Sequence, residues 1–98
     1  MAKRIEPIEV RRIDANTAEL KRMFVAPEER GKGLGQALLE RLEEEARALG
    51  STRLVLETGT RQRQAVALYE AAGFRQIPLY GEYLNSPGTS LCLGKDLA

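Results

Sequence analysis

The chain has 98 residues, of which 43% are apolar and 30% charged, and its formal net charge is +1. This length suits one domain with one modest core, here residues 1–98, and the balanced, interspersed charge argues against a nucleic-acid partner. No apolar run reaches the roughly 20 residues of a membrane span, so no membrane partner is predicted. The single cysteine, Cys92, cannot form an internal disulfide, which favours a reducing, cytoplasmic setting. Because histidine is absent, Ser-His and Cys-His nucleophile pairs and histidine-based zinc sites are excluded, and no metal site is predicted.

The first half of the chain predicts a hairpin and a long helix. Residues 5–13 and 17–25 mix β-branched and charged residues as strands do, and Asp14-Ala15-Asn16 between them is a turn signal. A helix is predicted up to Gly50, with an apolar stripe of Leu34, Leu38, Leu42, Ala46 and Leu49. We expect its acidic run, Glu43 to Glu45, to be solvated, with Glu43 able to pair with Arg47 one turn later.

The second half predicts three strands and one helix. Residues 52–58 alternate as a strand does, and residues 62–72 carry a helical stripe that Gly73 ends and against which Phe74 can fold back. Residues 75–79 and 90–93 are predicted to be the final strands, with a loop over 80–89 between them.

The segment from Arg30 to Gln36 holds three glycines at alternate positions, between a predicted strand and a predicted helix. Such a turn leaves backbone N–H groups exposed beside a helix N-terminus, an arrangement that binds phosphate. The segment is not a Walker loop, because Gly33 stands where Ser or Thr would follow Lys32. The glycine spacing of a dinucleotide fingerprint is also absent.

The pattern Arg30-x-x-Gly33-x-Gly35 resembles the acyl-coenzyme A loop of the GNAT superfamily of N-acetyltransferases. Residues 19–25 are similar to the central strand of that family, and residues 65–74 are similar to its later helix, which ends in Leu-Tyr-Glu-x-x-Gly-Phe. The three blocks stand in the family's order and span nearly the whole chain. The resemblance implies an α+β (α/β) fold, with a mixed, mostly antiparallel sheet and two helices.

This resemblance implies acetyl-CoA as the cofactor and assigns residues to it. Pyrophosphate would be bound by the loop and helix start, that is by Arg30, Gly31, Lys32, Gly33, Leu34, Gly35 and Gln36. Pantetheine would pair with the backbone of Met23, Phe24 and Val25, and an N–H near Phe24 would hold the oxyanion. Gln62 stands where the family often has an asparagine that contacts pantetheine.

The resemblance also implies direct attack of an amine on the thioester. Tyr69 matches the family tyrosine that protonates the departing thiolate, although a tyrosine that only packs on the sheet is the alternative. Glu19 aligns with a glutamate that acts as base in some members, Glu57 is the second candidate, and Glu19 could instead pair with Lys21 or Arg22. Tyr80 and Tyr83 either shape the acceptor pocket or pack, and Cys92 is expected to be a small buried residue.

The chain begins directly at the hairpin, whereas the family domain usually begins with a strand and two helices. We therefore expect a truncated acyl-CoA N-acyltransferase fold with an unpaired edge at residues 5–13 and an exposed apolar face, which favours a homodimer or larger oligomer. The predicted function is acetyl transfer from acetyl-CoA to a primary amine of a small molecule or peptide. The alternatives are a non-catalytic CoA or acyl-CoA-binding module, and a half-domain that needs a partner chain.

Overall fold

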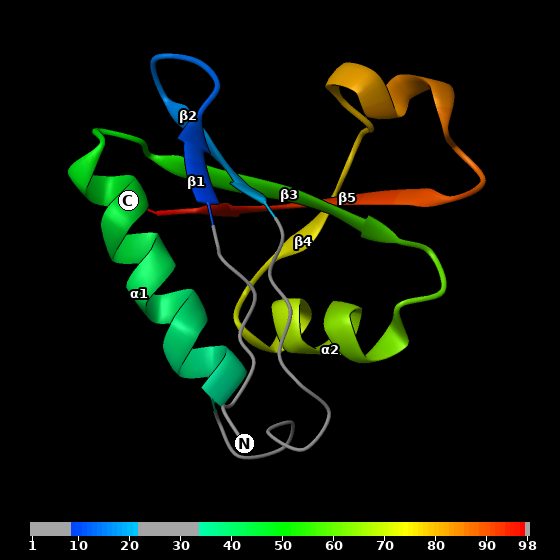
Figure 1. Cartoon of the computed structure of the whole chain (residues 1–98), viewed down its shortest axis with the longest axis horizontal. Coiled ribbons are helices and arrows are strands. Elements are labelled where there is room, and N and C mark those ends of the chain that lie inside the picture. The colour runs from blue at the N-terminus through cyan, green and yellow to red at the C-terminus, as the bar shows by residue number, and fades with distance from the viewer. Residues whose placement is uncertain (1–8, 22–33, 98) are drawn as a thin grey trace, which may run out of the picture.

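The computed structural model describes residues 9–21 and 34–97 of the chain, and these form one sheet with two α-helices (Figure 1). In chain order the elements are β1 (Glu9–Arg12), β2 (Thr17–Lys21), α1 (Leu34–Ala48), β3 (Arg53–Gly59), α2 (Arg63–Ala71), β4 (Arg75–Ile77), the 3-10 helix η2 (Gly81–Asn85) and β5 (Ser90–Asp96).

The five strands lie in the order β1-β2-β3-β5-β4. The β2–β3 pair is parallel and the other three pairs are antiparallel, which confirms the predicted mixed, mostly antiparallel sheet with two helices. β1 and β2 form the predicted hairpin, whose turn is held by the Asn16 backbone N–H donating to Asp14 Oδ1 at 2.8 Å. This bond lowers the pKa of the Asp14 carboxyl.

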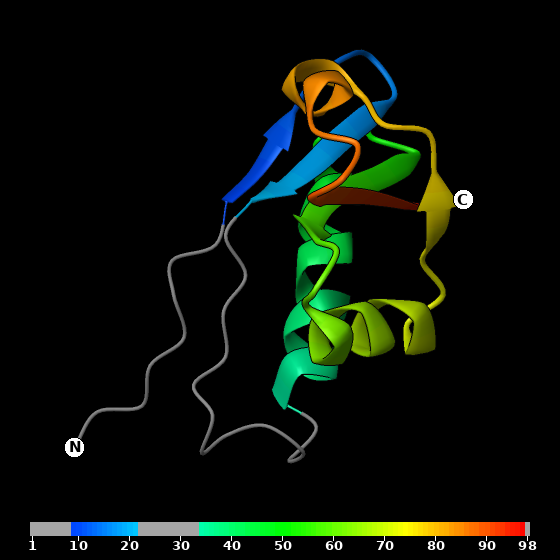
Figure 2. The same cartoon turned by 90° about the vertical axis from the view of Figure 1, so that its right-hand side faces the viewer.

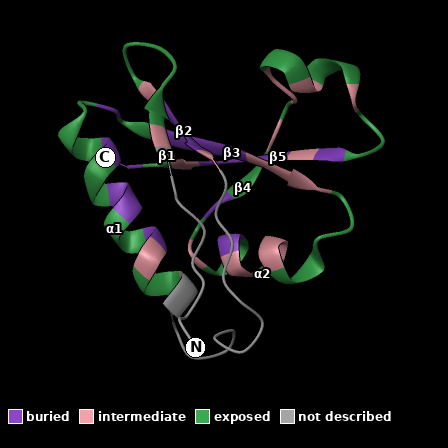
Figure 3. Ribbon diagram, in the orientation of Figure 1, coloured by how far each residue is buried: buried purple, intermediate pink, exposed green. Residues whose placement is uncertain are grey.

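Both α-helices cover the same face of the sheet, and η2 lies on the other side (Figure 2). The core between helices and sheet is apolar and closely packed, with its buried part in α1, the central strands and the end of α2 (Figure 3). Its largest fully buried side chains are Phe74, Leu39, Leu54, Leu56 and Leu93. Burial on one face explains why β2 alternates apolar Ala18 and Leu20 with polar residues, whereas β3 has three consecutive buried apolar residues, Leu54 to Leu56.

The long helix differs from its prediction at three positions, Leu39, Glu43 and Leu49. Gly50 ends it with φ +86°, as predicted, but Leu49 in the expected apolar stripe is exposed, while Leu39 is fully buried. The acidic run is not uniformly solvated, since Glu43 is buried and pairs with Lys95 at 2.9 Å and with Arg47 at 3.8 Å. The predicted Glu43–Arg47 pair is therefore confirmed, but the expectation that Glu43 is a solvated residue is wrong.

Several strand and loop boundaries differ from those predicted from the sequence. β5 continues to Asp96, three residues past its prediction, because it pairs along the full length of β3. β4 ends at Ile77, before Pro78, and the predicted loop over 80–89 contains η2. Residues 5–8 and 22–25 of the two predicted hairpin strands lie outside the described residues.

Candidate active site

The face of the sheet opposite the helices carries a row of polar and charged side chains. Strand register aligns Glu19 on β2 with Val55 on β3, Gly94 on β5 and Arg75 on β4. Residues in register share a face, so the period of two also places Lys21, Glu57 and Cys92 on this side. Here the chain after β4 folds back across the sheet, with η2 above it (Figure 2).

Glu19 is the centre of this polar cluster. Its side chain is only 5% exposed, and both carboxylate oxygens have hydrogen-bond or ion-pair partners. The Tyr80 hydroxyl donates to Oε2 at 2.7 Å, a length typical of a hydrogen bond to an ionised carboxylate. Oε1 faces two cations, with Arg11 at 3.6 Å and Lys21 at 3.8 Å. The Lys21 pairing is the one anticipated from sequence, whereas the Arg11 and Tyr80 contacts were not predicted.

Lys21 links this carboxylate to the second tyrosine of the loop. Its ammonium donates to the Tyr83 hydroxyl at 3.0 Å, and this bond is the main reason that the pKa of Lys21 is raised. Burial raises the pKa of Tyr83. The Tyr80 and Tyr83 rings pack edge to face, with centroids 5.3 Å apart. The two tyrosines therefore fix the segment after β4 onto the end of β2.

Tyr80 also covers the sole cysteine. Burial, first, and the hydrogen bond to Glu19 raise the pKa of Tyr80 well above its usual value, so its hydroxyl stays protonated at neutral pH. The backbone of Tyr80 interacts with the Cys92 thiol, which is fully buried and has its pKa raised by burial. Cys92 is thus the small buried residue that was expected, with no ready thiolate.

Tyr69 lies on the opposite side of the sheet from Glu19. It is the one buried residue of α2, is 6% exposed, and belongs to the core with Leu20 and Leu56. Its ring meets Phe74 edge to face at 5.8 Å, and burial raises the pKa of its hydroxyl. The two predicted catalytic side chains are therefore not in contact with each other, because β2 and β3 separate them.

The last registered pair of the described parallel β2–β3 ladder is Leu20 with Leu56, one residue before the described part of β2 stops at Lys21. β3 continues to Gly59 and stays paired with β5. Beyond Gly59, Gln62 leads into α2 and its side chain lies close to that glycine.

Most of the predicted cofactor-binding residues lie outside the described residues. These are Met23, Phe24 and Val25, predicted to bind pantetheine, and Arg30, Gly31, Lys32 and Gly33 of the predicted phosphate loop, whereas Leu34, Gly35 and Gln36 form the first turn of α1. Gln36 is exposed on this first turn.

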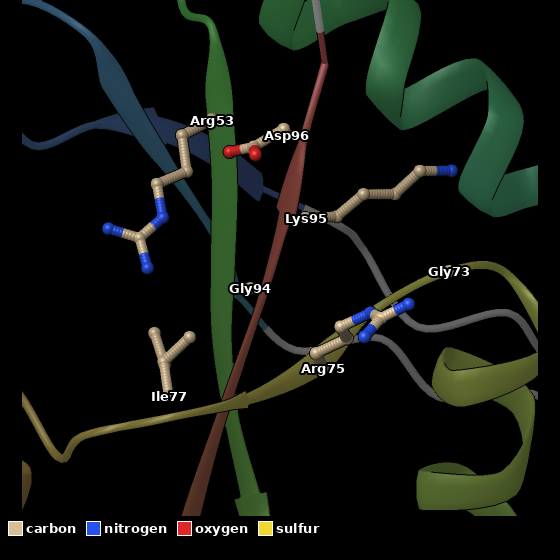
Figure 4. A pocket seen from close by; sticks show the side chains of 7 residues that line it. All are labelled: Arg53, Gly73, Arg75, Ile77, Gly94, Lys95 and Asp96. Atoms are coloured by element: carbon tan, nitrogen blue, oxygen red, sulfur yellow. The ribbon is translucent and has the colours of Figure 1, made fainter.

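A separate hollow of about 380 Å³ lies at the far end of the sheet, around β4 and β5 (Figure 4). Arg53 and Ile77 point to one side of β5, and Lys95 points to the other, toward α1. The Lys95 ammonium is occupied by Glu43 and by the Ala72 carbonyl. The hollow holds neither predicted catalytic side chain, so we do not assign the chemistry to it.

The exposed apolar face that the sequence led us to expect is not found in the described residues. The exposed large apolar side chains of the described residues are Ile13, Leu49 and Leu84. Val55 and Cys92, on the face of the sheet opposite the helices (here called the open face), are buried. The reason is that the chain after β4 covers this face itself. The expected unpaired edge is present, since β1 has one neighbouring strand in the described sheet.

Neither α-helix of the described chain is long and apolar enough to span a membrane. Within the same residues no cluster of three or more acidic or cysteine side chains is placed to hold a metal ion.

Comparisons with known proteins agree on one family. The chain is 48% identical over 79 residues to an IAA acetyltransferase of Azospirillum brasilense, an alignment covering 81% of this chain and 51% of that protein. The fold matches an acetyltransferase from Streptococcus agalactiae with a TM-score of 0.78 and 37% identity, covering 91% of this chain and 57% of that one. At 22% identity it also has the fold of a GNAT family acetyltransferase from Elizabethkingia anophelis solved with acetyl-CoA bound, with a TM-score of 0.77 and coverage of 91% and 66%.

The chain thus spans between about half and two thirds of the length of these three relatives. The sequence pattern of the acetyltransferase (GNAT) family matches residues 4–74, well over half of the chain. The chain therefore belongs to the acetyltransferase (GNAT) family.

Proposed function

We propose that this chain transfers the acetyl group of acetyl-CoA to a primary amine of a small molecule or peptide, by direct attack of the amine on the thioester. The observation that carries the proposal is the placement of Glu19 and Tyr69 on opposite sides of the neighbouring parallel strands β2 and β3. A thioester held between these strands would have a carboxylate on one side and a phenol on the other. Those two groups are what removal of a proton from an amine and protonation of a thiolate require.

The cofactor would enter between the two strands and end at the start of α1. Coenzyme A supplies an activated acyl group and a thiol leaving group when it is bound. The glycine-rich segment 30–36 includes the first turn of α1, Leu34 to Gln36, and the backbone N–H groups and positive dipole end of a helix N-terminus favour a pyrophosphate. Met23 to Val25 would bind pantetheine, and Gln62 beside Gly59 is positioned at the neighbouring strand end. The acetyl-CoA-bound relative from Elizabethkingia supports this choice of cofactor.

Tyr69 would return a proton to the coenzyme A thiolate as it leaves. Burial raises the pKa of this phenol, so it holds its proton at neutral pH until a stronger base forms beside it. A thiolate that forms where water is excluded is such a base. Glu57 remains the second candidate for the general base that deprotonates the amine, since it lies on the same face of the sheet as Glu19.

A non-catalytic CoA-binding module is the second candidate, because the chain spans about half of the Azospirillum relative. For the assembly we propose a homodimer or larger oligomer, supported by the edge position of β1 in the described sheet. We place the reaction in the cytoplasm, since the one cysteine has no partner for a disulfide. Sedimentation over a hundredfold range of concentration tests the assembly, and one invariant monomer mass would contradict it.

Calorimetric titration with acetyl-CoA tests the site. We expect saturable binding by the parent chain and none by Gly33→Glu, because a carboxylate in the loop would repel the pyrophosphate. Gly88→Glu is the matched control, since Gly88 faces open space in another loop and should leave binding unchanged. Release of free thiol with a panel of amines then separates the two functions. If the chain binds acetyl-CoA but releases no thiol with any amine, the non-catalytic binding module is favoured. If the folded parent does not bind acetyl-CoA, both the acetyltransferase and the binding module are contradicted.

A further inference from the structure

The buried position of Glu19 raises the question of how its carboxylate meets an acceptor amine. Its side chain is 5% exposed, and each carboxylate oxygen already has partners. An acceptor from solvent therefore meets the groups around Glu19 before it meets Glu19 itself. A base that acts from this position needs an intermediate group that can accept one proton while it gives up another.

The described groups in contact with the carboxylate differ in this ability. Arg11 is a guanidinium, which keeps its protons and has no lone pair to offer. Lys21 has a raised pKa because it donates to Tyr83, so it too remains a cation without a lone pair. The Tyr80 hydroxyl donates its proton to Glu19 and keeps lone pairs on the same oxygen. Within the described residues, Tyr80 is thus the neighbour of Glu19 able to take a proton and pass one on.

The surroundings of Tyr80 keep its hydroxyl protonated and hydrogen-bonded to Glu19. Glu19 faces it from β2, Cys92 from β5 and Tyr83 from η2, and Lys21 of β2 joins the same cluster through Tyr83 and Glu19. More distant charges at Arg11, Glu57 and Glu82 act on the same cluster. Because burial raises the pKa of Tyr80, the phenol does not ionise, and it stays a donor to Glu19 between turnovers.

We propose that Tyr80 is a catalytic residue of the transfer, relaying a proton from the acceptor ammonium to Glu19. The N–H bond of the ammonium breaks as a new O–H bond forms at the Tyr80 oxygen, and the original Tyr80 proton moves to Glu19 Oε2. The products are a neutral amine ready for attack, a neutral Tyr80 and a protonated Glu19, so charge and protons balance. Glu19 later returns its proton to solvent by the reverse path. This inference rests on the proposed function.

Tyr80→Phe and Glu19→Gln test the relay, with an alkylamine acceptor and acetyl-CoA. Each variant should lower kcat/KM at pH 7 by about 100-fold or more, the usual size of a lost acid–base catalyst. The kcat/KM of the double variant should lie within about threefold of that of the less active single variant, because both substitutions interrupt one path. Melting temperature and acetyl-CoA titration establish that each variant folds and binds.

The acceptor can then be varied to separate a relay from a role in folding. An alkylamine with a pKa of about 10 is neutral in roughly one molecule in a thousand at pH 7, so the defect of both variants should shrink steadily toward pH 10. An arylamine acceptor, already neutral at pH 7, should lose less than about tenfold. Tyr83→Phe removes the same atom from a hydroxyl bound to Lys21 rather than Glu19, and its pH profile should keep the wild-type shape.

Each outcome decides a separate question. If the parent chain is active and Tyr80→Phe keeps its rate and pH profile, the relay is overturned while the proposed function stands. A loss in Tyr80→Phe far smaller than in Glu19→Gln, or losses that multiply in the double variant, also overturns the relay. If the parent binds acetyl-CoA but acetylates no amine, the proposed function fails and the relay fails with it.

Discussion

Lys95 on β5 and Glu43 on α1 are joined by a 2.9 Å ion pair that ties the last strand to the first helix. The same ammonium donates to the Ala72 carbonyl at 2.6 Å, at the end of α2. Arg47, which also pairs with Glu43, donates to the Leu97 carbonyl at 3.0 Å. One lysine therefore connects both helices to the C-terminal strand, and it satisfies a helix-end carbonyl as well as a buried carboxylate.

Lys95→Met should destabilise the chain by about 2 kcal/mol, because the Glu43 carboxylate would remain buried with Arg47 as its one cation among the described residues. Urea unfolding followed by circular dichroism measures the change. Arg41→Met is the matched control, since it removes an ion pair with Glu45 in which both side chains are more than half exposed, and it should cost less than about 0.5 kcal/mol. Equal losses in the two variants would contradict the role of Lys95.

Gly94→Ala should destabilise the open face of the sheet by about 1 kcal/mol. A Cβ at this position would lie 3.2 Å from the Ile77 side chain and 3.4 Å from Val55, so the Ile77 side chain would have to shift to make room. Gly88→Ala adds the same methyl group where nothing lies within 4 Å, and it should leave the melting temperature nearly unchanged. A Gly94→Ala chain as stable as its parent would show that Ile77 yields without cost.

The local signals in the sequence were enough for the elements and their order. Gly50 and Gly73, with φ of +86° and +99°, end the helices where predicted, and the Asp14 turn forms the hairpin. The pairing of Glu19 with Lys21, two residues apart on β2, was also anticipated from the sequence. These features depend on neighbours within a few residues, so a single chain is sufficient to predict them.

The contacts of the candidate site depend on partners far apart in the chain. Tyr80 and Glu19 are 61 residues apart, and Lys95 and Glu43 are 52 residues apart. No spacing rule reports such pairs, because they arise when η2 folds over the sheet and β5 packs beside α1. The burial of Glu43 was missed for this reason, and so was the covering of the open face.

Tyr69→Phe should lower kcat about 100-fold if Tyr69 protonates the leaving thiolate, while acetyl-CoA binding is retained. The substitution removes one oxygen and keeps the ring that meets Phe74 at 5.8 Å, so the melting temperature should change little. A general acid must be protonated, and burial raises the pKa of this phenol, so kcat in the parent should fall only above about pH 10. That alkaline decline should be absent from Tyr69→Phe, and a variant with the parent's rate and decline would exclude the role.

The tyrosines should also make the chain lose stability in alkaline solution. The pKa values of Tyr69, Tyr80 and Tyr83 are all raised on folding, chiefly by burial. Above pH 10 the unfolded chain releases these protons while the folded chain keeps them, so the free energy of unfolding falls as pH rises. The raised pKa of Lys21 acts in the same direction above pH 10.5.

A tyrosine that is ionised in the unfolded chain and protonated in the folded chain lowers the stability by at most about 1.4 kcal/mol per pH unit, so Tyr80→Phe should flatten the decline by up to that slope. Urea unfolding at intervals from pH 8 to pH 11 measures it, and slopes are compared rather than absolute stabilities because the substitution also removes the bond to Glu19. Absorbance near 295 nm should show less tyrosinate in the folded parent at pH 10.5 than in the same chain unfolded in urea at that pH. A parent that ionises three ordinary tyrosines near pH 10, or a Tyr80→Phe chain with the parent's slope, would mean that Tyr80 is not held protonated beside Glu19.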